Sequence, residues 1–367
     1  MKVKGKLLKG IKTGAAVLLV LTAVACVVRR VPQVFSERDT ALAAAAFTLT
    51  DGKMFAGGGT EPSSAPAVTQ STAPTAAAAA ETAALPVKKR DKTGYYDSFG
   101  NHSGEARYTV TEKTIYPDGT EVDGCYVKNY TGLDMDFAAL LGEPLPFQTE
   151  TGDGEPQVLI YHTHTSEGYL DEDVDYYYES YYSRTGNRDY NVVAAGEAIA
   201  EELRRQHIAV LHDETVHDST YNGSYDRSAQ TVKKLMQAHP SIKVALDIHR
   251  DALGSEEYKI KTVFEHDGKK GAQIMILSGC DPDNERGFVN WRHNLSFALK
   301  LQHAAEHNCP GMTRPLDFGC FAYNEYICDG SLLIEVGTDA NTADEAAFAG
   351  QMLAKALADV LTDKKTA

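Results

Sequence analysis

Cysteine is scarce in this sequence, and its spacing is not that of a common metal or redox motif. Six cysteines are spread over 367 residues, and no two of them form a C-x-x-C pair. This spacing disfavours a zinc ribbon or a thioredoxin-like site. Cys320 and Cys328 could pair in an oxidising exterior, but the sequence does not decide whether they do.

An excess of positive charge is also missing. The formal net charge is −15, from 36 basic and 51 acidic side chains. Proteins that bind nucleic acid need a basic surface, because they must neutralise phosphates. We therefore expect that nucleic acid is not a partner of this protein.

The uncharged run near the N-terminus is short for a membrane span. It covers the fifteen residues 14–28, whereas a spanning helix needs about 20. Residues 1–30 hold seven basic side chains and no acidic one, and Val31, Val34 and Phe35 could extend the run. We predict an uncleaved, single-pass signal anchor over residues 1–35, with its basic start inside and the rest of the chain exported. A cleaved signal peptide, cut near Ala25, is the alternative.

Composition divides the rest of the chain into three segments. Residues 36–94 are rich in small and polar residues and have few large apolar ones, which predicts a flexible tether. Residues 95–154 are predicted to be a small β-rich lead-in, because apolar and polar residues alternate around a turn at Asp118-Gly119 and suggest a hairpin or a small sheet. Residues 155–365 are predicted to be the catalytic domain.

Strand and helix patterns alternate in this last segment. The expected strands are 158–161, 208–211, 243–248 and 332–335, with a β-ribbon over 259–277; the expected helices begin near Val192 and cover 224–238, 291–307 and 345–361. Such alternation predicts an α/β fold, with a mostly parallel twisted sheet and helices on both faces.

Chemically competent side chains follow three of the predicted strands. The first strand leads into His162, His164 and Glu167, the second into His249, and the third into Glu335. In a parallel sheet these strand ends meet at one edge, where ligands bind. Two histidines and a carboxylate around one ion are typical of catalytic zinc, and a further glutamate can transfer protons. The sequence therefore predicts a zinc site at this edge.

Several motifs in this order resemble one protein family. They are YHTHTSEGY at 161–169, the loop 213–218, YNGSY at 221–225, DIHRDA at 247–252, and LIEVG at 333–337 preceded by Tyr323-Asn324. Together with the N-terminal anchor and tether, these segments resemble stage II sporulation protein P of endospore-forming bacteria. The resemblance implies a membrane-anchored peptidoglycan hydrolase with N-acetylmuramoyl-L-alanine amidase activity and cross-link-cleaving endopeptidase activity. It also implies action on the forespore-septum side of the membrane during engulfment, together with sporulation proteins D and M.

A more distant resemblance, to the zinc-dependent amidases of cell-wall turnover, suggests roles for individual residues. It implies Zn²⁺ as the cofactor, His164 and His249 as ligands, and Glu335 as the catalytic glutamate. His162 fits less well, because it would point the other way from an extended strand. Glu167 is the first choice for the carboxylate ligand. The chain departs from the amidase pattern before Asn191, so Asp189 and Glu179 remain alternatives to Glu167.

Other interpretations stay open on the sequence alone. Arg250 is predicted to act in catalysis, by holding a neighbouring ligand or a substrate carboxylate, although an ordinary surface ion pair explains it equally well. The tyrosines at 176–182 could line a groove for glycan or stem peptide, or form a partly buried lid. The same metal ligands would also suit a zinc carboxypeptidase that trims wall peptides, and a non-catalytic wall-binding scaffold is a further alternative.

Overall fold

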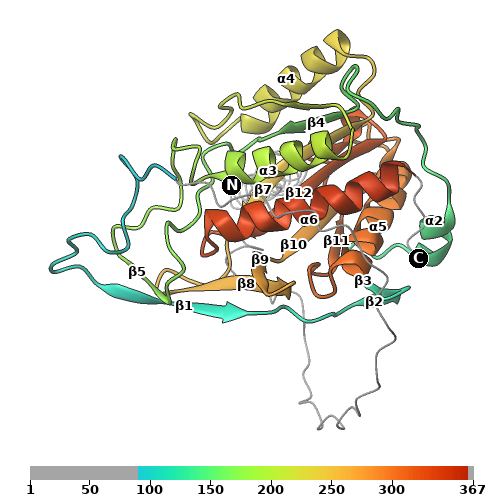
Figure 1. Ribbon diagram of the computed structural model, residues 1–367. Helices are drawn as coiled ribbons and strands as arrows, with labels where there is room; N and C mark the ends of the chain where they lie inside the picture. Colours follow the sequence, from blue (N-terminus) through green and yellow to red (C-terminus); the bar gives the residue numbers. More distant parts are fainter. Residues whose placement is uncertain (1–89, 363–367) are drawn as a thin grey trace, which may run out of the picture. The chain divides into compact units, whose positions relative to one another are not determined.

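The computed structural model describes residues 90–362 (Figure 1). The predicted anchor and all but the last residues of the predicted tether lie outside this range. Among the described residues, no helix combines the length and apolarity needed to cross a membrane. The division of the chain into four segments therefore stays a prediction.

The main sheet has eight strands in the order β2-β3-β11-β10-β12-β7-β4-β6. Their bounds are Thr120–Val122 for β2, Cys125–Asn129 for β3, Val158–Tyr161 for β4, Val210–His212 for β6, Val244–Asp251 for β7, Ile274–Gly279 for β10, Leu316–Gly319 for β11 and Gly330–Thr338 for β12. The β2–β3 and β10–β12 junctions are antiparallel, whereas the others are parallel. The expected mostly parallel sheet is thus a mixed one, because β10 runs against β12.

A second sheet of four strands lies beside the first, in the order β5-β1-β8-β9. It contains β1 (Arg107–Lys113), β5 (Tyr176–Tyr178), β8 (Tyr258–His266) and β9 (Lys269–Ala272). The β8–β9 hairpin turns at Asp267-Gly268, where both residues have positive φ, as the Asp-Gly pair predicts. By contrast, β1 pairs with β8 and β5 and not across the expected turn at Asp118-Gly119. The hairpin of the lead-in forms instead between β2 and β3, and it turns at Asp123-Gly124.

Five α-helices and a short 3₁₀ turn, η2 (Glu325–Ile327), complete the described part of the chain. The helices are α2 (Phe137–Gly142), α3 (Val192–Arg205), α4 (Ser224–Ala238), α5 (Trp291–Asn308) and α6 (Ala343–Leu361). The Asn191 side chain caps α3 by accepting from the Val193 amide, and Thr342 with Glu345 forms a capping box on α6. These caps explain why the predicted starts of α3 and α6 lie within two residues of the observed ones.

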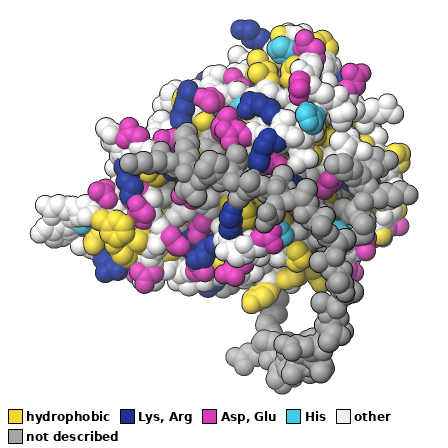
Figure 2. Space-filling model, viewed as in Figure 1, with side chains coloured by type: hydrophobic (Ala, Val, Ile, Leu, Met, Phe, Trp, Pro, Cys, Tyr) yellow, Lys and Arg dark blue, Asp and Glu magenta, His cyan; other side chains and the backbone are white. Residues whose placement is uncertain are grey.

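The two faces of the main sheet are covered by different helices. On one face, Ile160 and Leu246 belong to the large core that includes α3, α5 and α6. On the other face, Leu159 and Ala245 pack with Val232 of α4. Figure 1 shows α6 between α3 and α5, and Figure 2 shows acidic and basic side chains interspersed over the face that carries α3 and α6. The prediction of helices on both faces is confirmed.

The two cysteines considered as a pair are both free. Cys328 is half-buried, and Cys320 is exposed. The Sγ atom of Cys320 lies 3.6 Å from Sγ of Cys280, and the two residues directly follow β11 and β10. The structure therefore brings Cys320 to a cysteine that is distant in the sequence.

Candidate metal centre and active site

His249 and Glu335 lie opposite each other on neighbouring strands. β7 and β12 are parallel, and their register pairs the Cα atoms of these two residues. Both residues lie inside strands rather than beyond the strand ends, because the pairing continues to Asp251 and Thr338. Strand alternation places them on the face covered by α4, in line with Ala245 on β7 and Leu333 on β12. Neighbouring strands thus bring together two residues that are far apart in the sequence.

The His249 ring lies between two carboxylates. Its Nδ1 is 3.2 Å from Oε2 of Glu167, and its Nε2 is 2.9 Å from Oδ1 of Asp247. The second contact is an ion pair whose angle is not that of a hydrogen bond, so Nε2 has no well-aligned partner among the described residues. The Thr163 amide and hydroxyl donate to Asp247 over 2.8 and 2.6 Å. The ring is therefore held from both sides by buried acids.

This arrangement shifts the pKa values of His249 and Glu167 so that both side chains favour their charged forms. Burial disfavours the charged imidazolium, but the negative charges of Asp247 and Glu167 outweigh it and raise the pKa of His249 well above its ordinary value. Burial likewise opposes ionisation of Glu167, yet His249 and Arg250 hold its pKa well below the usual range. Without a metal ion the pair is thus an imidazolium and a carboxylate, and metal binding by His249 must displace its proton.

His164 follows β4 and comes to the same face as His249. The two rings are perpendicular, with centroids 5.4 Å apart, and His164 stacks on Tyr221 at 4.6 Å. The Ser224 hydroxyl lies 3.4 Å from Nδ1 of His164. Burial lowers the pKa of His164 to about 4, against the opposing effect of Glu167. The ring is therefore neutral at neutral pH, the form that can ligate a metal.

His162 lies on the opposite face of the sheet and does not join this group. Its Nδ1 donates to the Ile248 carbonyl over 2.9 Å, and its Nε2 shares a hydrogen bond of 2.9 Å with Nε2 of His212. A Cβ on Gly196 of α3 would lie only 2.7 Å from each of these rings, so a glycine is required there. His162 thus joins α3, β6 and β7 on the side away from His249.

Arg250 contacts the loop that carries Glu167. Its amide donates to Oε2 of Glu167 over 3.3 Å, and its guanidinium donates to the carbonyls of Gly168 and Ser183 over 3.1 and 2.7 Å. Because the guanidinium is buried and engaged with backbone oxygens, these contacts position the loop. The predicted catalytic role of Arg250 stays a prediction.

Glu335 has one carboxylate oxygen without a partner. Its Oε2 is buried and accepts no hydrogen bond from any residue between 90 and 362. Burial, with the nearby charge of Asp251, raises the pKa of Glu335 to about 8. Asp251 itself forms an ion pair of 2.7 Å with Arg314. Glu335 is therefore a half-buried acid. Within residues 90–362, no ion pair or hydrogen bond of its side chain indicates a structural role.

Of the three candidate carboxylate ligands, Glu167 is the one that contacts a predicted histidine ligand. Asp189 accepts a hydrogen bond of 3.2 Å from the Asp91 amide, near the start of α3. Glu179 is exposed just after β5. The position of Glu167 beside His249 agrees with the first choice made from the sequence, while its role as a ligand remains a prediction.

The donor atoms suit zinc in kind and, for two of the three residues, in spacing. Zinc binds nitrogen and oxygen ligands at about 2.0–2.2 Å in a tetrahedron, so two ligands of one ion lie somewhat more than 3 Å apart. The 3.2 Å between His249 and Glu167 is close to this separation. In addition, the ligating histidine of such sites usually faces a carboxylate through its other nitrogen, as His249 faces Asp247.

The third proposed ligand is not yet in place. Among the described residues, two triplets have ligand atoms within 4.8 Å of one another: Glu197, His212 and Glu214, and Glu112, Asp173 and Glu345. The set of His164, Glu167 and His249 is not one of them. A shared ion therefore requires the ring of His164 to turn towards the other two.

Sequence reasoning assigned no role to several residues that surround this site. Asp247 lies two positions before His249 on the same strand, so the period of two could have placed it on the same face. Tyr221, in the loop before α4, and Tyr225, in the first turn of α4, contact the His164 ring. Arg184 lies 3.5 Å from Oε1 of Glu167, and no local pattern indicated that contact.

The chain matches a known family over most of its length. The family model for stage II sporulation protein P (SpoIIP) matches residues 65–358. The chain belongs to the stage II sporulation protein P family. This confirms the resemblance found in the motifs. A family member, stage II sporulation protein P of Bacillus subtilis (strain 168), is 29% identical over an alignment of 237 residues that covers 59% of this chain and 53% of the relative. The chain thus spans about half the length of the curated relative it matches.

Solved structures of amidases show weaker similarity to this member of the stage II sporulation protein P family. N-acetylmuramoyl-L-alanine amidase AmiC2 of Nostoc punctiforme is 12% identical, with a TM-score of 0.30 over 58% of this chain and 98% of that chain. The CwlD amidase from Clostridioides difficile, in complex with the GerS lipoprotein, is 14% identical, with a TM-score of 0.31 over 56% and 97%. Ami1 from Mycobacterium smegmatis is 12% identical, with a TM-score of 0.32 over 58% and 98%. At these TM-scores the similarities carry no weight for the chemistry of this chain.

Proposed function

We propose that this protein is a sporulation peptidoglycan hydrolase that cleaves the amide between N-acetylmuramic acid and L-alanine of the stem peptide. Membership of the stage II sporulation protein P family supports the broader part of this proposal. The observation that carries the chemistry is the register of β7 and β12, which sets Glu335 beside His249, with Glu167 3.2 Å from the same ring. Two imidazoles and a carboxylate next to a proton-transferring glutamate suit metal-assisted amide hydrolysis.

In this proposal His164, Glu167 and His249 hold Zn²⁺, and Asp247 keeps the His249 ring in place. The metal, when bound, supplies a Lewis acid that polarises the scissile carbonyl and makes water acidic enough to attack near neutral pH. In its ionised form, Glu335 accepts the proton of the attacking water at its carboxylate and delivers it to the departing amine of L-alanine. Arg250 and Arg184 fix the Glu167 loop, so that the carboxylate does not swing away from His249.

The proposal extends to where the protein acts and with what. The protein would act from the membrane on the septal wall, through the anchor predicted for residues 1–35. It would cooperate with sporulation proteins D and M, and would also cleave peptide cross-links. Family membership supports these points, as does the uncharged run at residues 14–28 with basic residues on both sides.

Product analysis on a defined muropeptide tests the bond that is cleaved. We expect mass spectrometry to show a glycan with a free lactyl carboxylate and an intact peptide that begins with L-alanine. Treatment with a chelator should stop the reaction, and added Zn²⁺ should restore it. Release of a single C-terminal amino acid would instead support the carboxypeptidase, and unchanged substrate would support a scaffold.

A further inference from the structure

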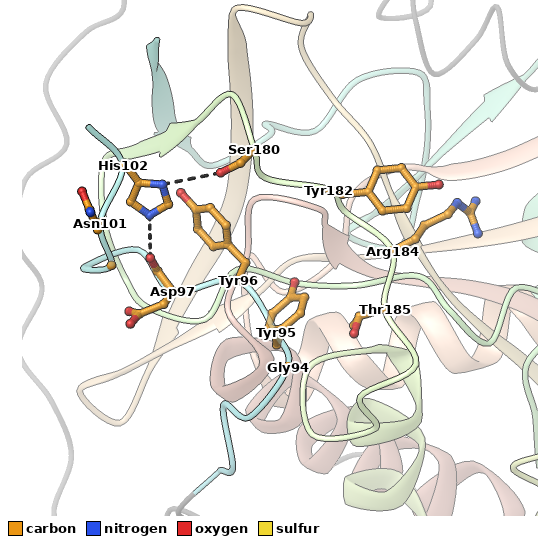
Figure 3. Close-up of a pocket in the computed structure, with 11 residues that line it drawn as sticks. Gly94, Tyr95, Tyr96, Asp97, Asn101, His102, Ser180, Tyr182, Arg184 and Thr185 are labelled. Carbon is orange, nitrogen blue, oxygen red and sulfur yellow. Dashed lines mark hydrogen bonds between the residues drawn. The ribbon is translucent and has the colours of Figure 1, made fainter. Parts of the chain in front are cut away.

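A hollow of about 440 Å³ lies beside the Glu167 loop (Figure 3). This volume falls within the roughly 300–1,000 Å³ of small-molecule pockets. Figure 3 shows Tyr182 and Arg184 projecting from one segment and Tyr95 and Tyr96 from another. Asn101 and Ser180 add neutral polar groups to the lining. The hollow therefore combines aromatic rings with hydrogen-bonding side chains.

Two tyrosines of the lining, Tyr95 and Tyr96, are held in place by contacts within the protein. The Tyr95 ring stacks on Tyr190 at 4.9 Å, and the Tyr96 hydroxyl accepts from the Tyr178 amide over 2.9 Å. By contrast, the side chain of Tyr182 is 71% exposed, although large aromatic side chains usually bury their rings. An exposed ring at the edge of a polar hollow is available to stack on a ligand.

The hollow is linked to the proposed catalytic centre by Arg184, which lines the hollow and lies 3.5 Å from Oε1 of Glu167. The segment around Arg184 pairs with the loop of Glu167, since the Thr185 amide donates to the Ser166 carbonyl over 2.7 Å. The guanidinium lies 5.2 Å from the centroid of the Tyr221 ring, and that ring stacks on His164. A ligand group in the hollow would therefore lie one side chain away from the site where the amide is cleaved.

We propose that this hollow is a subsite for an N-acetylated sugar ring of the glycan strand, with Tyr182 as its stacking platform. The inference rests on the proposed function, and it names the part of the substrate that this side of the site binds. A sugar ring offers an apolar face of C–H groups and a rim of hydroxyl and amide groups, which matches rings bordered by neutral donors and acceptors.

The charges of the lining favour a neutral sugar over an acidic peptide. The positive charge of Arg184 is already committed to Asp218 at 3.1 Å and to Glu167 at 3.5 Å. Asp97 is exposed at the hollow and forms no ion pair with another described residue. His102 also lines the hollow, but its Nδ1 lies 3.1 Å from Oε1 of Glu105, so its charge when protonated already has an acidic partner. A ligand carboxylate would therefore meet the exposed Asp97 and no positive charge that is free of an acidic partner.

Binding of a soluble sugar probe tests the subsite without any need for catalysis. We expect the full-length protein to bind the tetramer of N-acetylglucosamine, and Tyr182→Ala to weaken this binding about three- to tenfold. Tyr116→Ala is the matched control, because Tyr116 is 78% exposed and lies outside the hollow. Failure of the wild-type protein to bind the tetramer, or equal affinities of the two variants, would overturn the subsite. Tyr182-dependent binding of free stem peptide in place of the tetramer would overturn its assignment to sugar.

Kinetics then separate this inference from the proposed function. On glycan-linked stem peptide, Tyr182→Ala should raise KM by a similar factor and leave kcat within about twofold, because uniform substrate binding is lost. An unchanged KM would count against the subsite even if the hydrolase is confirmed. An inactive wild-type protein that still binds the tetramer through Tyr182 would refute the hydrolase and leave the sugar subsite standing.

Discussion

Replacement of Glu335 by glutamine is expected to lower kcat on peptidoglycan by about 10²–10⁴-fold and to leave the zinc content unchanged. Glutamine keeps the shape of the side chain but cannot accept a proton from water or deliver one to the leaving amine. Glu335 is not among the proposed metal ligands, and its Oε2 has no partner among residues 90–362 that the change would disrupt. Release of stem peptide from purified wall, measured together with metal content per chain, gives both quantities.

Asp317→Asn is the matched control for this variant. Asp317 is likewise an acid of the main sheet, and burial raises its pKa to about 7. It lies on β11, which β10 separates from the strand of Glu335. The control should therefore keep most of the activity. Near-normal turnover by Glu335→Gln would remove Glu335 from the mechanism, and a loss of zinc in that variant would make it a ligand instead.

Replacement of His249 by alanine is expected to abolish zinc binding and to lower the free energy of unfolding by about 3–5 kcal/mol. His249 lies between Glu167 and Asp247, and all three side chains are buried. Without the imidazolium, two carboxylates remain close together in the interior with less compensating charge. Denaturant unfolding of the zinc-free proteins measures the loss of stability, and metal analysis measures the loss of zinc.

Two further histidine variants separate the two effects. His164→Ala should also lose zinc but unfold more nearly like the wild type, because His164 is neutral and stacked rather than ion-paired. His162→Ala should lose stability but keep zinc, because its ring faces Gly196 and His212 on the other side of the sheet. Zinc loss in His162→Ala but not in His164→Ala would exchange the roles of these two residues.

Much of the fold could be predicted because its signals are local. The apolar run 158–161 forms β4 with the predicted bounds, Asn191 caps α3, and the Asp-Gly pair at 267–268 turns a hairpin. The direction of His162 also followed from strand alternation alone. In each case a short stretch of sequence contains the physical cause of the structure.

The rest depends on contacts between distant segments, which no local pattern encodes. The polar residues from His249 onward marked the expected end of a strand, yet β7 continues because β12 pairs with it as far as Asp251. Likewise, β1 lies against β8 although the sequence suggested a local hairpin. The contacts of Arg184 and Tyr221 with the site arise from loop packing, so they became visible only in three dimensions.

The X-ray absorption spectrum of the purified protein at the zinc edge tests the central claim most directly. If His164, Glu167 and His249 hold the ion, the spectrum should show nitrogen and oxygen ligands at about 2.0–2.2 Å, with the scattering of two imidazole rings. The signal of one imidazole should disappear in His164→Ala that has been loaded with excess zinc. Sulfur ligands at about 2.3 Å, or wild-type protein that takes up no zinc, would contradict the account.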